Sequence, residues 1–164
     1  MTKAALKPPP AADLYGTDFH AWTQAQAALL RARRFDELDL GNLIEEVASV
    51  GASEKREIES RLDILLAHLL TWAYQPGART SSWQATLREQ RMRIGRILKS
   101  SPSLKKYPAE VFSESYLAGR LEAARETGID FSLFPEQPPF TVEQALDPDF
   151  LPKEPGLLDP SRIP

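Results

Sequence analysis

The placement of proline limits the fold of this chain more than any other feature of its sequence. After three consecutive prolines at 8–10, none occurs until Pro76, and eight of the fourteen lie between 135 and 164. Proline lacks a backbone donor and clashes with the preceding helical turn, so it is rare inside long helices. We therefore expect a helical body over 17–128, followed by an irregular, acidic strap.

The composition of the chain favours helices over sheets. It contains 42 leucine and alanine residues but only 11 valine and isoleucine residues. β-Branched side chains are favoured in strands, whereas leucine and alanine lose little conformational freedom in a helix. A length of 164 residues suits one ordinary domain. We predict an all-α fold, a compact bundle of about five helices with an irregular, proline-rich C-terminal strap.

The expected organisation has an extended lead-in at 1–13, a single helical domain at 14–152 and a flexible tail at 153–164. Within that domain we place the bundle at 17–128 and a docked strap at 129–152. The strap contains four phenylalanines that we expect to bury apolar area on the bundle, namely Phe131, Phe134, Phe140 and Phe150.

Apolar spacings of three and four residues predict the individual helices. The first begins at Thr17 or Asp18, and a second covers about 40–50, with Gly51 as its C-cap. The apolar residues that share one face of this second helix are Leu40, Leu43, Ile44, Val47 and Val50.

A third helix, starting at Ser53, is apolar over a broad face and is expected to be central in the bundle. Its expected buried residues are Ile58, Leu62, Leu65, Leu69 and Trp72. The remaining helices are expected at 82–99, at 108–127 and, after a capping box, near 141–144.

Several classes of function lack the residues that they require. The absence of cysteine excludes a disulfide frame, a thiolate metal site and a cysteine nucleophile. No two glycines lie closer than nine residues, which excludes a glycine-rich phosphate loop. No stretch could span a bilayer, and no secretory signal is visible. We expect a cytoplasmic protein with no cofactor, no metal and no membrane contact.

The amino-acid sequences of several segments are similar to those of one known family. These segments are LYGTDFHAWTQAQAALLRARRFDELDLGNLIEEVASVG, ESRLDILLAHLLTWAYQP, SSWQATLREQR and FPEQPPFTVEQALDPDFLP. From about Leu14 to Pro152 the chain resembles the bacterial family called domain of unknown function 29. The resemblance implies a compact helical fold and implies no activity. Gln137 stands where a cysteine is frequent in the family.

Two residues, His68 and Glu46, are candidates for metal binding or acid–base catalysis. His68 lies at the edge of the apolar face of the third helix, and Glu46 borders that of the second. Di-iron bundles use a Glu-x-x-His motif on each of two helices, and neither histidine here follows a glutamate at that spacing. We expect a histidine that hydrogen-bonds a carboxylate, and keep an enzyme around His68 and Glu46 as a third alternative.

A basic strip follows one side of the helix at 82–99. Residues 79–106 have a net charge of +7, whereas residues 126–164 have −6. The residues of the strip that could bind an anion are Arg88, Arg93, Arg96 and Lys99. We expect the acidic strap and other acids to neutralise this strip in part, with anion binding as the alternative. Gln90 and Arg91 flank the apolar face of the same helix, and Arg91 could pair with Glu46.

These observations favour binding over catalysis. We expect a protein–protein interaction or regulatory module whose partner is another protein or a second copy of the chain. The alternative is a nucleic-acid or anion binder that uses the basic face of the 82–99 helix. The whole chain has a net charge of −3, so nucleic acid is the less favoured partner.

Overall fold

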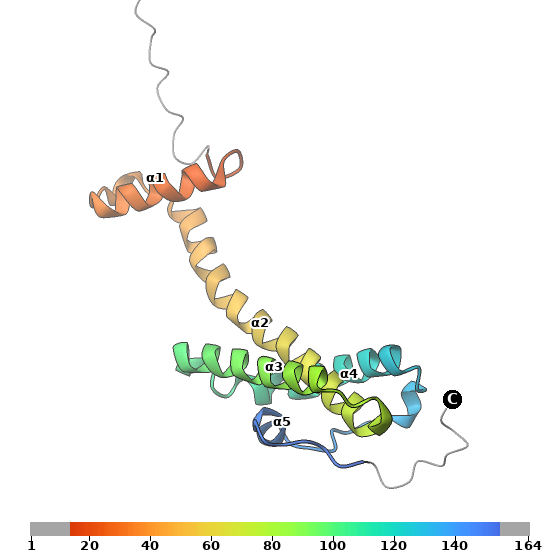
Figure 1. Ribbon diagram of the computed structural model, residues 1–164. Coiled ribbons are helices and arrows are strands. Elements are labelled where there is room, and N and C mark those ends of the chain that lie inside the picture. The colour runs from red at the N-terminus through yellow and green to blue at the C-terminus, as the bar shows by residue number, and fades with distance from the viewer. Residues whose placement is uncertain (1–13, 155–164) are drawn as a thin grey trace, which may run out of the picture. The chain divides into compact units, whose positions relative to one another are not determined.

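The computed structural model describes residues 14–154, and within that range it is built from helices and contains no strand. This confirms the all-α prediction. The expected lead-in at 1–13 and most of the expected tail lie outside the described residues. The α-helices are α1 (Phe19–Arg31), α2 (Leu40–Tyr74), α3 (Ser81–Ser100), α4 (Tyr107–Thr127) and α5 (Val142–Leu146) (Figure 1). The short 3₁₀ helices between them are Phe35–Glu37, Pro76–Ala78, Pro102–Leu104 and Phe131–Leu133.

Local capping interactions explain where most helices begin and end. Asp18 caps α1 by accepting a hydrogen bond from the Ala21 amide, and Thr80 caps α3 by accepting one from the Trp83 amide. Gly128 ends α4 in the left-handed conformation, with φ of 70°. The predicted capping box of α5 is present, because Thr141 and Gln144 exchange hydrogen bonds between side chain and backbone.

Helix α2 differs from the prediction of two helices at 40–50 and from Ser53. It is one helix of 35 residues that continues through Gly51 and Ser53. Gly51 does not adopt the positive φ that a glycine C-cap needs. A glycine inside a helix costs only about 1 kcal/mol relative to alanine, and no proline interrupts this segment. The helix formers on both sides therefore keep α2 continuous.

The chain divides into two compact units, residues 1–52 (unit 1) and 53–164 (unit 2), and the boundary falls within α2. The single domain expected at 14–152 spans both units. None of the helices in the described range is long and apolar enough to cross a membrane.

The core of unit 2 forms around the leucine-rich face of α2. All five residues expected to be buried on this face are buried, and Leu66 and Leu70 join them. Leu87 and Ile94 of α3 and Tyr116 and Ala123 of α4 belong to the same core. Because leucines at spacings of three and four line one side of a helix, this face was predictable from the sequence.

Helices α2 and α4 are in close contact at Gly119. A Cβ atom added at this glycine would lie 3.0 Å from the Ala67 backbone nitrogen and 3.0 Å from the Leu66 Cβ atom. Real Cβ contacts are rarely this short, and the Ala67 nitrogen belongs to helix backbone that cannot move aside alone. Glycine is therefore required here by the helix–helix distance, whereas Gly95 on α3 has open space around it.

We predict opposite effects for the same substitution at these two glycines. Gly119→Ala should lower the free energy of unfolding by about 1–3 kcal/mol because the added methyl group overpacks the α2–α4 contact. Gly95→Ala should raise it by up to about 1 kcal/mol because alanine is the better helix former. Urea unfolding followed by circular dichroism measures both. A Gly119→Ala protein as stable as Gly95→Ala would show that the helices are not in close contact.

Candidate functional site

The side chain of Arg91, on α3, binds main-chain carbonyls of the C-terminal strap. Its Nε donates to the carbonyl of Ala145 at 2.8 Å, its Nη2 to Phe150 at 2.8 Å and its Nη1 to Pro148 at 3.3 Å. The guanidinium group is suited to this because it presents five donors in a fixed plane. Burial lowers the pKa of Arg91, and the Asp147 and Asp149 carboxylates oppose that shift.

The contact with Glu46 that the sequence suggested for Arg91 is therefore replaced by contacts with backbone carbonyls. Glu46, in unit 1, accepts a hydrogen bond from the Tyr15 hydroxyl at 2.6 Å. Carbonyl acceptors leave no trace in a sequence, because every residue has one. The partners of Arg91 could be recognised only from the structure.

Two residues of α4 hold the beginning of the strap in a similar way. Arg120 donates through Nη2 to the Phe134 carbonyl at 3.0 Å, and its guanidinium lies 4.2 Å from the centre of the Phe131 ring. The Tyr116 hydroxyl donates to the Pro135 carbonyl at 2.9 Å, and burial raises the pKa of Tyr116 to about 12. Phe134 is itself buried. The strap is thus bound by polar groups along its backbone and by aromatic side chains.

An apolar cavity of about 560 Å³ lies where the strap meets the end of α2. Tyr74, Phe140 and Phe150 contribute aromatic walls, and Asp149 and Lys153 lie among the lining residues. Its other lining residues are Ala73, Pro135, Pro139, Gln144, Leu151 and Pro152. The cavity is large enough for a small ligand or a few side chains of a partner.

His68 lies in a smaller cleft of about 300 Å³ between α2 and α4. Its Nδ1 atom is 3.0 Å from the Ile64 carbonyl of its own helix, so the expected histidine–carboxylate hydrogen bond is replaced by a backbone contact. Asp63, Glu122 and Glu126 also line the cleft. Burial raises the pKa of Asp63. Glu46 is in unit 1 and has its own partner, and residues 14–154 contain no group of three metal-ligating side chains that could hold an ion.

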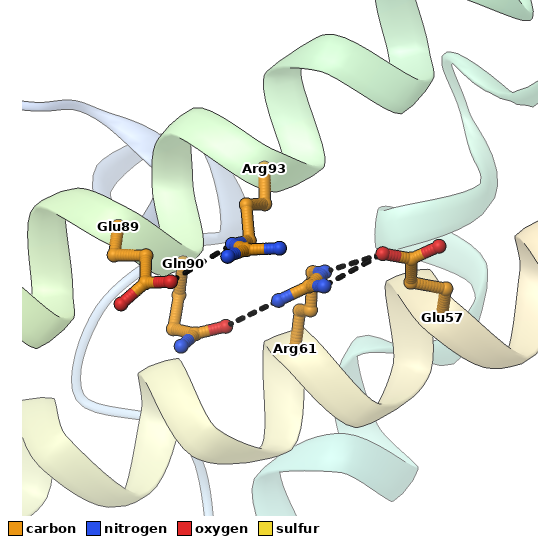
Figure 2. Close-up of polar contacts among 5 residues, drawn as sticks. All are labelled: Glu57, Arg61, Glu89, Gln90 and Arg93. Carbon is orange, nitrogen blue, oxygen red and sulfur yellow. Dashed lines mark hydrogen bonds and ion pairs between the residues drawn. The ribbon is translucent and has the colours of Figure 1, made fainter.

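Within the basic strip of α3, the charge of Arg93 is compensated by Glu89 of the same helix. The Arg93 Nε donates to Glu89 at 2.9 Å (Figure 2). In the same view, Arg61 of α2 donates to Glu57 at 2.7 and 2.9 Å and to the Gln90 side chain of α3 at 3.2 Å. The Arg61–Gln90 bond joins α2 to α3 and satisfies the polar group of Gln90 beside the core.

Acidic residues neutralise the basic segment only in part, and the described residues of the strap do not pair with the rest of the strip. Glu154 pairs with Arg79 at 3.2 Å, and Asp149 lines a small cleft with Arg88 at one end of the strip. Arg96 and Lys99 are exposed and form no ion pair with any residue in 14–154. Two cations of the strip therefore remain accessible to an anion.

Unit 1 has a small polar core around Trp22. The Trp22 indole donates to Asp39 at 3.0 Å, and the Gln26 side chain accepts from the Asp39 amide at 2.9 Å. The Tyr15 ring packs edge-on against Trp22 with 4.9 Å between ring centres. Among the described residues of unit 1, only Trp22 and Gln26 are buried.

The most unusual surface of unit 1 is on the first turns of α2. Leu40, Ile44, Val47 and Val50 are 61%, 58%, 72% and 69% exposed. We call these four residues the α2 apolar face. Their spacing of three and four is visible in the sequence, but spacing alone does not distinguish a buried face from an exposed one.

The comparison with known families covers both units. The family model described as Domain of unknown function DUF29 matches residues 14–151. The chain belongs to the DUF29 family. The match includes the strap up to Leu151 as well as unit 1. No curated protein and no solved structure matches the chain. For this DUF29 protein, function must therefore be argued from its own surfaces.

We predict that Arg91 keeps the strap in place. Arg91→Met should lower the free energy of unfolding by about 2–3 kcal/mol, because three carbonyls lose a charged donor. Hydrogen exchange at 142–150 should accelerate, while Arg93→Met, at an exposed position, should leave it unchanged. Arg91→Lys should be intermediate, because an ammonium group cannot reproduce the planar set of donors. Unchanged exchange in Arg91→Met would contradict this role.

A second prediction separates accessible from compensated charges of the strip. The double variant Arg96→Glu, Lys99→Glu should have a free energy of unfolding within about 0.5 kcal/mol of the parent's at both low and high salt. Arg93→Glu should melt lower at low salt than at high salt, because it places two carboxylates four residues apart. Thermal melts at both salt concentrations measure this. A salt-sensitive loss in the double variant would restore the view that the strap neutralises these cations.

Proposed function

We propose that this DUF29 protein is a protein–protein interaction module and that its contact surface is the α2 apolar face. The observation that carries the proposal is the exposure of four large aliphatic side chains on consecutive turns of one helix. Scattered apolar residues are normal on a protein surface, but a contiguous apolar patch usually marks an interaction site.

The small core of unit 1 supports the same function. Two residues in the described part of this unit are buried, and Phe19, Phe35 and the α2 apolar face are exposed. Small units bury too little surface to be stable without help from a partner, a metal or disulfides. The chain has no cysteine, so disulfides cannot supply that help. A protein partner can, and the lack of cysteine also fits a reducing cytoplasm, where we place the interaction.

Anion binding through α3 is a second candidate function. It is favoured by the exposure of Arg96 and Lys99 without ion pairs in the described part of the chain. The strip contains no aromatic side chain on which bases could stack, so a phosphate backbone or an acidic protein segment would be its ligand. This function requires that Arg96→Glu, Lys99→Glu lose retention on heparin while its melting temperature stays unchanged.

The proposed function predicts that a single carboxylate on the α2 apolar face removes the partner. The tagged protein is purified from its own host, and chains that copurify in stoichiometric amount are identified, including an untagged copy of the protein itself. Val47→Asp should reduce their recovery by at least about tenfold, since a buried unpaired carboxylate is strongly unfavourable at an interface.

Ser49→Asp is the matched control. It adds the same group two residues away, at an exposed position on the opposite side of α2. It should retain the partner as the parent does. Equal recovery with Val47→Asp, or no stoichiometric partner with the parent, would rule out this function for the face.

A further inference from the structure

We infer that a second copy of the chain covers the α2 apolar face, so that two α2 helices pack against each other about a twofold axis near Val47. This inference rests on the proposed function and names its partner. It follows from the shape of the face, its lack of charge, its area and the incomplete core of unit 1.

The face is shaped for close contact with another helix. Gly51 lies about 40° around α2 from Val47 at 100° per residue, and no atom approaches within 4 Å of a Cβ placed on this glycine. Small residues next to branched aliphatic ones leave grooves into which the ridges of a neighbouring helix fit.

The charges of this segment lie at the edge of the face or on the far side of the helix. Between Leu40 and Ser53 the charged residues are Glu45 and Glu46. At 100° per residue Glu45 lies about 160° around the helix from Val47, whereas Glu46 lies about 100° from Val47 but only about 40° from Val50, at the edge of the face. Glu46 is held by the Tyr15 hydroxyl. The centre of the face, at Leu40, Ile44 and Val47, carries no charge. Two copies can therefore bring these residues together without placing like charges opposite each other, and a charged partner would gain no ion pair there.

The uncovered area is sufficient for a dimer. The four side chains are 58–72% exposed, and each leaves on the order of 100 Å² of apolar surface uncovered. A stable interface buries about 800 Å² on each partner, of which about 60% is apolar. The α2 apolar face thus supplies most of the apolar area that one side of such an interface contains.

A second copy of the chain can also bury the exposed aliphatic residues of unit 1, and such a partner is present wherever the protein is made. In a twofold contact the same patch serves both subunits, so one face is enough to cover both. Ile44 and Val50 are each three residues from Val47, and the axis would place Val47 beside Val47 of the partner subunit. Each unit 1 would then bury its exposed aliphatic residues against an identical set.

The test uses the purified full chain alone. Sedimentation equilibrium from low to high micromolar concentration should give about twice the monomer mass of 18.3 kDa. Val47→Asp should shift the dissociation constant by at least about 100-fold toward monomer, and Ser49→Asp should remain dimeric. Circular dichroism confirms that each variant keeps its helical content.

Crosslinking gives a readout that does not depend on a disruptive substitution. Because the chain has no cysteine, Val47→Cys introduces its one thiol. A short bis-maleimide should link two Val47→Cys chains rapidly, and two Ser49→Cys chains at least about tenfold more slowly, since the latter thiols face away from the axis.

The outcomes separate this inference from the proposed function. A parent that is monomeric at all concentrations, but that retains a different chain from its host through Val47, overturns the dimer and leaves the interaction function standing. A dimer that Val47→Asp does not weaken, or equal crosslinking of both thiols, shows that another surface pairs and also overturns it. A monomer without any partner overturns both.

Discussion

Burial of the leucine-rich face of α2 is the interaction on which unit 2 depends. The side chains of Leu62, Leu65 and Leu69 are fully buried, and α3, α4 and the strap all contribute residues to the same core. Burial of this apolar surface is the main favourable contribution to folding. Gly119 sets how closely α4 approaches α2, because any larger residue there would contact the backbone of Ala67.

The same helix has a different environment in unit 1. There its aliphatic side chains keep the helical spacing, but the described residues of the unit do not cover them. Hydrogen bonds from Trp22 to Asp39 and from Tyr15 to Glu46 fix the local geometry instead. A helix that is amphipathic in both units thus forms a core in one and a free surface in the other.

Much of the fold was predictable from the sequence, because helices and caps are local. Spacings of three and four identified the buried residues of α2 from Ile58 onward, and Thr141 with Gln144 identified the capping box. The break expected at Gly51 was wrong because a single glycine lowers helix stability by less than the adjoining turns supply.

The candidate sites were less predictable, because they depend on contacts distant in sequence. The basic residues of α3 could be listed, but whether an acidic segment lies over Arg96 is a matter of tertiary structure. Periodicity likewise identified the apolar residues around Val47 without showing what covers them. Arg91 was recognised as a polar residue beside the core, yet its acceptors carry no side-chain signature.

Recognition of the strap through its carbonyls has a consequence for how this protein can evolve. Arg91 and Arg120 bind the main chain at Phe134, Ala145 and Phe150, and a main-chain oxygen is unaffected by a change of side chain. Substitutions at the bound positions are therefore tolerated as far as packing allows. The number of residues from Ala145 to Phe150 is not free, because one guanidinium group binds the carbonyls of Ala145, Pro148 and Phe150, and an insertion or deletion between them would move a carbonyl out of its reach. Selection on this segment should act on its length more strictly than on its residue identities.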